Sequence, residues 1–174
     1  MRSSGLGLKR LAIGVALVTF VAFWTYALFF ASKEAVNKIG DRGWAARAET
    51  ICRAANERRE ELADFRRVDS DDAAMLDERA DIVDRATDIV EEMVDDVVAA
   101  VPTDEKGRAI VPDWEADYRT YLQNRRDFAE ALRGGENVPF SEAAYEGVPI
   151  SERIGTFAGD NEMESCAPPR DLSI

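Results

Sequence analysis

The longest uninterrupted hydrophobic stretch of the chain lies near its N-terminus. The 22 residues from 11 to 32 carry no charge, and only two threonines, one tyrosine and one serine interrupt the apolar side chains. A helix of that length rises roughly 33 Å, which matches a bilayer core of about 30 Å. The pattern therefore predicts a transmembrane helix over residues 11–32, preceded by a short cytoplasmic tail over residues 1–10.

A cleaved signal peptide is the competing interpretation, because Arg2, Lys9 and Arg10 form a basic leader. The apolar run is longer than the 7–15 residues usual for a signal core. Cleavage after Ala31 would also place Phe29 where a small residue is needed, and no cysteine follows for a lipid anchor. An uncleaved anchor in membrane lipid is favoured, with lipid contacts expected from Leu11, Phe20, Trp24 and Phe30.

Three later segments repeat apolar residues every third or fourth position, which is the period of an amphipathic helix. They cover residues 44–67, 71–100 and 113–133, and no convincing alternating strand pattern occurs. A linker over residues 33–43 contains Gly40 and Gly43, so a hinge is expected there, although a continuous helix is the alternative. The fold class is all-α, with an antiparallel three-helix bundle over residues 44–133.

The C-terminal part, residues 134–174, is rich in turn residues. Gly134 and Gly135 end the third helix, and four prolines follow. Ser151 resembles a helix cap followed by one or two turns. We expect this tail to pack back on the bundle.

Charge and composition exclude several functions. The chain has 34 acidic and 22 basic residues and no histidine. All the acids and 19 of the bases lie in residues 33–174, so phosphate backbones would be repelled and nucleic acid is not an expected partner. Without histidine, the chain cannot form a Ser-His-Asp triad or a common zinc site. We expect no enzymatic activity and no cofactor.

Two cysteines, Cys52 and Cys166, lie in the part predicted to be outside the cytoplasm. An oxidising compartment favours a disulfide between them. The tail is long enough for Cys166 to reach the first soluble helix. Two reduced cysteines that never meet remain the alternative.

The second soluble helix carries six acids at helical spacing, on one face. They are Asp77, Asp81, Asp84, Asp88, Glu91 and Asp95. Carboxylates are ligands for hard cations, so one interpretation is a weak Ca²⁺ or Mg²⁺ surface. The other is a solvated face partly neutralised by the arginine-rich first helix. The sequence alone assigns no metal ligand.

In the third helix, Arg125 and Arg126 stand beside Tyr118 and Tyr121. These residues fit either an anion or carbohydrate contact, or ion pairs at the edge of the core.

The orientation of the chain in the membrane is also open, because Lys and Arg flank the apolar segment on both sides and the positive-inside rule barely discriminates between the two orientations. The short tail and the cysteines favour a cytoplasmic N-terminus and an extracytoplasmic C-terminal domain.

The stretch Trp44-Ala-Ala-Arg-Ala-Glu-Thr-Ile-Cys52 and the segment from Ile154 through Cys166 to Ala-Pro-Pro resemble uncharacterised membrane-anchored envelope proteins of actinobacteria. The resemblance covers about 25 residues. It implies a location in the plasma membrane and a disulfide, and it carries no activity to transfer.

These features predict a membrane-anchored extracytoplasmic protein that binds or scaffolds other envelope or membrane proteins. The alternative is a domain that senses a small ligand or a divalent cation through the acidic helix. A hydrolase with paired carboxylates is a third hypothesis.

Overall fold

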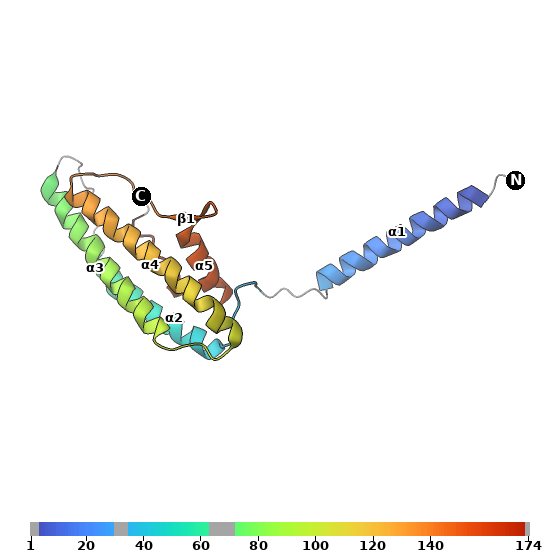
Figure 1. Ribbon diagram of the computed structural model, residues 1–174, viewed down its shortest axis with the longest axis horizontal. Helices are drawn as coiled ribbons and strands as arrows, with labels where there is room; N and C mark the ends of the chain where they lie inside the picture. The colour runs from blue at the N-terminus through green and yellow to red at the C-terminus, as the bar shows by residue number, and fades with distance from the viewer. Residues whose placement is uncertain (1–3, 30–34, 63–71, 173–174) are drawn as a thin grey trace. The chain divides into compact units, whose positions relative to one another are not determined.

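The computed structural model describes residues 4–29, 35–62 and 72–172 (Figure 1). The chain forms two compact units, Met1–Ala35 and Val36–Ile174. The division between the units falls inside the predicted linker over residues 33–43.

The first unit contains one helix, α1 (Ser4–Phe29). Its residues 9–29 are long and apolar enough to cross a membrane. Of the residues predicted to contact lipid, Leu11, Phe20 and Trp24 lie in α1 and are about half exposed or more, and their contact with lipid stays a prediction. Phe30 lies outside the described residues. The helix begins before residue 11, because nothing in the N-terminal flank stops a helix.

The second unit is mostly helical, which confirms the predicted fold class at that level. Its helices are α2 (Arg42–Glu60), α3 (Ala73–Val98), α4 (Glu105–Arg133) and α5 (Ile150–Asp160), followed by the 3₁₀ helix η1 (Glu164–Cys166). Helix α3 packs against both α2 and α4, α5 packs on α4, and η1 packs on α2 (Figure 1). One apolar core is shared by these elements, and a smaller cluster joins α3, α4 and Leu172.

Two aspartates fix the ends of α2 and α4. The Asp41 carboxylate accepts hydrogen bonds from the Trp44 backbone N–H (2.8 Å) and the Thr103 backbone N–H (2.9 Å). The Asp104 carboxylate accepts from the Gly107 N–H (2.8 Å) and from the N–H of Asp41 itself (2.9 Å). Each aspartate therefore satisfies a helix N-terminus and a neighbouring loop.

Two predicted helix boundaries were wrong. Helix α4 begins at Glu105, eight residues before the predicted start, because Asp104 caps it and Pro112 is accommodated inside the helix. Gly107 permits this start, since a Cβ there would lie 2.7 Å from Pro102 Cβ. Helix α2 ends at Glu60 rather than at residue 67, and residues 63–71 lie outside the description.

The segment before α5 contains a two-stranded sheet that the sequence analysis missed. Strands β1 (Ala144–Tyr145) and β2 (Val148–Pro149) pair antiparallel, with Tyr145 opposite Val148. Glu146 and Gly147 between them both have positive φ, of 51° and 83°. This is the geometry of a type I′ turn, and the Glu-Gly pair was its only signal. Helix α5 has eleven residues, more than the one or two turns predicted.

The residues just before α2 are packed against the end of α5. Ile39 is buried, and its N–H donates to Asn161 Oδ1 (2.8 Å). Asn161 Nδ2 donates to the Asn37 oxygen (2.9 Å) and to the Phe157 oxygen (2.9 Å). The alternative of one continuous helix from α1 into α2 is therefore wrong for residues 35–41.

Candidate functional site

Cys52 in α2 and Cys166 in η1 form the pair expected from the sequence, with their sulfur atoms 2.04 Å apart. Both side chains are completely buried. The bond closes a loop between residues 114 positions apart. Loops of about 100 residues give roughly 4.7 kcal/mol of stabilisation in the chain-entropy account. The buried bond therefore belongs to the structural framework.

The C-terminal strap, which we define as residues 165–172, lies across the helices and is held by side chains from them. Its backbone oxygens accept three hydrogen bonds: from Asn56 Nδ2 to the Ser165 oxygen (2.8 Å), from Tyr118 Oη to the Cys166 oxygen (2.7 Å) and from Tyr121 Oη to the Pro169 oxygen (3.0 Å). Burial raises the pKa of the Tyr118 and Tyr121 hydroxyls, so both stay protonated and able to donate.

A fully buried arginine fixes the end of the strap. Arg125 in α4 is 0% exposed, and its two Nη atoms bind both carboxylate oxygens of Asp171, at 2.8 and 2.9 Å. Its Nε donates to Thr87 Oγ1 (2.9 Å) in α3. Burial alone would raise the pKa of Asp171, but the hydrogen bonds and charge of Arg125, with the charge of Arg59, hold it below the usual value. Arg125 and Asp171 thus form an internal ion pair.

The acids of α3 form a ladder of ion pairs with α4. Arg119, Arg126 and Arg133, seven residues apart, take part in it. The pairs are Arg119 with Glu91 and Asp95, Arg126 with Asp88 and Glu91, and Arg133 with Asp81 and Asp84. Five of the six acids singled out in the sequence therefore have arginine partners, whereas Asp77 forms no ion pair with another residue of the described ranges.

The arginine partners of the α3 acids come mainly from α4. The sequence had favoured α2 as their source. Among the ion pairs that the α3 acids make with other described residues, α2 contributes only Arg58, which pairs with Glu92 at 2.8 Å. Within the described ranges, no group of three or more Cys, Asp or Glu residues is placed to hold a metal ion. The α3 carboxylates are directed to the neighbouring helix, so this face gives no specific support to cation sensing.

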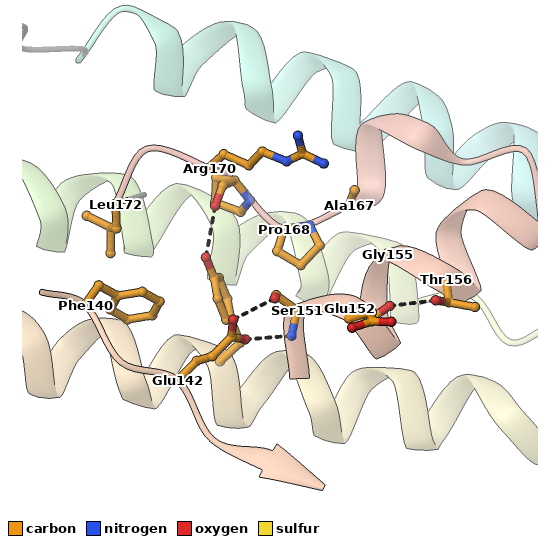
Figure 2. Close-up of a pocket in the computed structure, with 12 residues that line it drawn as sticks. Phe140, Glu142, Ser151, Glu152, Gly155, Thr156, Ala167, Pro168, Arg170 and Leu172 are labelled. Carbon is orange, nitrogen blue, oxygen red and sulfur yellow. Dashed lines mark hydrogen bonds between the residues drawn. The ribbon is translucent and has the colours of Figure 1, made fainter. Parts of the chain in front are cut away.

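A pocket of about 550 Å³ opens between α5, the strap and the segment around Phe140 (Figure 2). Its apolar lining includes Tyr121, Phe140 and Leu172. Pro168 and Pro169 of the strap also line the pocket. A volume of this size is within the range of small-ligand sites in proteins.

Polar groups of the pocket lie near the start of α5. Glu142 accepts hydrogen bonds from the Ser151 backbone N–H (2.7 Å) and hydroxyl (2.7 Å), and so caps the helix in place of the expected serine side chain. Glu152 and Thr156 of α5 also line the pocket, and so does Arg170. The pocket therefore presents two carboxylates, one guanidinium group and an apolar lining.

The sequence analysis did not find this pocket. Its walls come from α4, from the segment before β1, from α5 and from the strap, so no local pattern encodes it. The comparisons add no assignment: no protein-family model matches the chain, and no curated protein or solved structure does either.

Proposed function

We propose that this chain is a membrane-anchored interaction protein whose helical domain lies on the extracytoplasmic side of the plasma membrane and binds other envelope proteins without catalysing a reaction. The observation that carries the proposal is the pairing of Cys52 with Cys166 in the unit that follows the apolar helix α1. Disulfides persist in oxidising compartments, and a helix of this length and composition suits a bilayer.

The proposal includes an antiparallel three-helix arrangement of α2, α3 and α4. The order of contacts supports it: α3 residues 81, 88 and 95 pair with α4 residues 133, 126 and 119. The residue numbers rise on one helix as they fall on the other. Between α2 and α3, the Trp44 indole N–H donates to the Ala100 oxygen (2.6 Å) while Arg58 pairs with Glu92, which is again an antiparallel order.

An N-terminus in the cytoplasm follows from the same reasoning, because the disulfide-bonded unit must then be outside. Flanking charge contributes little, since Lys and Arg occur on both sides of the apolar segment. The binding role itself is supported by a compact acidic unit of about 140 residues that follows an anchor, an arrangement that keeps a protein surface near the membrane.

Co-purification tests the binding role. The full chain is expressed at its native level in its host, cross-linked, and purified in mild detergent. The control chain keeps residues 1–35 and carries an unrelated soluble domain in place of residues 36–174. We expect a companion at near-stoichiometric yield with the full chain and its absence with the control. A full chain that purifies alone, or a companion retained by the control, contradicts a binding role of the helical domain.

A further inference from the structure

We propose that the pocket between α5 and the C-terminal strap receives a basic side chain, arginine or lysine, of a partner protein. This inference rests on the proposed binding role and names the chemistry of the partner. The pocket combines a size of about 550 Å³ with apolar lining residues and the carboxylates of Glu142 and Glu152. A long basic side chain has a matching build, with an aliphatic stem and a cationic head.

Charge in the pocket favours a cation. Glu142 and Glu152 line it together with Arg170, so carboxylates outnumber basic groups by two to one. Ser151 occupies one position on each oxygen of Glu142, and each oxygen retains a second lone pair. The unit around the pocket is strongly acidic as well, since residues 33–174 hold all 34 acids of the chain and 19 of its 22 bases. A basic partner segment is therefore attracted over distance as well as at contact.

Gly155 lies at the pocket and adds no side chain to it. Glycine inside a helix is less favourable than alanine, yet α5 contains Gly155 and Gly159. A Cβ at either position would meet nothing within 4 Å, so packing inside the chain does not require glycine. Gly155 lines the pocket and Gly159 does not. A side chain at position 155 would occupy the pocket, so glycine there keeps the site open.

The two glycines provide a matched pair of variants. Gly155→Leu fills the pocket, whereas Gly159→Leu adds the same side chain to the same helix outside it. Glu152→Gln removes one carboxylate of the pocket, and Glu130→Gln on α4 serves as its surface control, because Glu130 is exposed and does not line the pocket. Circular dichroism and thermal melting establish that each variant is folded.

Binding is measured on the full chain in nanodiscs of zwitterionic phospholipid, by ligand-observed saturation-transfer NMR. The probes are Nα-acetylarginine methylamide and the isosteric, uncharged Nα-acetylcitrulline methylamide. We expect the arginine probe to bind about tenfold more tightly than the citrulline probe, as loss of one charge-assisted contact implies. Gly155→Leu abolishes the binding, Glu152→Gln weakens it several-fold, and both control variants bind like the unmodified chain.

Several results overturn the inference: no binding of the arginine probe, equal binding of the two probes, or equal loss in Glu152→Gln and Glu130→Gln. If Gly155→Leu does not fold, the glutamate pair decides alone. These measurements need no partner protein, so they are separate from the co-purification. A companion protein that co-purifies while the probe fails to bind would leave the binding role intact and refute this pocket.

Discussion

Single residues hold the ends of the helices in this chain, and two helices end in the same way with different residues. After α4, the N–H of Glu136 donates to the Ala131 oxygen (2.9 Å), with Gly135 at a φ of +85°. After α5, the N–H of Met163 donates to the Ala158 oxygen (2.9 Å), but Glu162 occupies the left-handed position with a φ of +59°. Both are Schellman motifs, and only the first uses the residue that suits it.

Replacing Glu162 with glycine should therefore stabilise the fold by about 0.5 kcal/mol. The left-handed conformation costs an L-residue roughly 1–2 kcal/mol, and glycine removes this cost. The greater conformational freedom of glycine in the unfolded chain cancels about half of the gain. Its ion pairs with Lys38 and Arg42 are exposed and contribute little. Urea unfolding of the full chain in detergent measures the change.

Glu57→Gly, inside α2 and three residues before its end, is the control, and it should lose up to about 1 kcal/mol, as is usual for glycine in a helix. A loss of stability in Glu162→Gly comparable to that in the control would show that the strain at Glu162 is not relieved.

A second residue-scale prediction concerns Asp171, whose pKa lies below the usual value of 3.8 in the folded chain. Because the pKa of Asp171 is lower in the folded chain than in the unfolded chain, its ionised carboxylate stabilises the fold at any pH above the unfolded pKa. This stabilisation is lost as the pH falls below about 4. At pH 7, Asp171→Asn should cost about 3–5 kcal/mol, because Arg125 is left buried without its counter-ion.

Urea unfolding at pH 7 and at pH 3 measures this cost. The free energies of unfolding of the unmodified chain and of Asp171→Asn should differ less at pH 3 than at pH 7. The double variant Arg125→Met with Asp171→Asn should lose less than Asp171→Asn alone, because neither charge then remains unpaired. A cost below about 1 kcal/mol for Asp171→Asn at pH 7 would mean that the strap is not held by this pair.

At the scale of elements, the contact between α3 and α4 combines an apolar seam with a ladder of charges. Leu76, Val83 and Val90 are buried at steps of seven along α3. Arginines at steps of seven along α4 meet the acids beside that seam. A shift of one helix by a single turn would break the seam and the ladder together, so the two patterns specify the same register.

Arg126→Gln should cost about 0.5–1 kcal/mol at 0.1 M NaCl, since Arg126 pairs with both Asp88 and Glu91 at a partly exposed site. The cost should become smaller at 1 M NaCl, where charges are screened within about 3 Å. Thermal melting at the two salt concentrations measures it. Arg47→Gln on α2 is the comparison, and it should have an effect within about 0.5 kcal/mol at either concentration. A salt-independent cost for Arg126→Gln would point to packing instead of charge.

The sequence predicts these elements unequally. The periodicity of α3 and its flanking Asp72 and Pro102 place that helix within a few residues, because local signals are strong there. Pro112 misled the prediction of α4, since a proline inside a helix normally marks its end. The ion-pair partners of the α3 acids depend on which helix lies against the acidic face of α3. The amphipathic patterns of α2 and α4 suit that place equally well, so the sequence could not decide between them. The pocket depended on distant segments and could not be read from any one of them.

At the scale of the whole molecule, an apolar helix precedes a compact helical unit. Helix α1 has the length and composition of a membrane span, and the unit Val36–Ile174 is tied by a buried disulfide between residues 114 positions apart. The strap carries both the disulfide and the Asp171 contact, so it links the end of the chain to α2 and α4. The stability of the unit thus depends on an oxidising compartment, which connects the fold to the proposed location.

Cysteine labelling tests that connection most directly. Exposed Ser141 is replaced by a reporter cysteine, and intact cells are treated with a membrane-impermeant maleimide. The account predicts that the reporter is labelled in intact cells, and that Cys52 and Cys166 become reactive in denaturant only after reduction. Labelling of the reporter only in permeabilised cells, or reaction of Cys52 and Cys166 in denaturant without a reductant, would contradict an extracytoplasmic, disulfide-bonded domain.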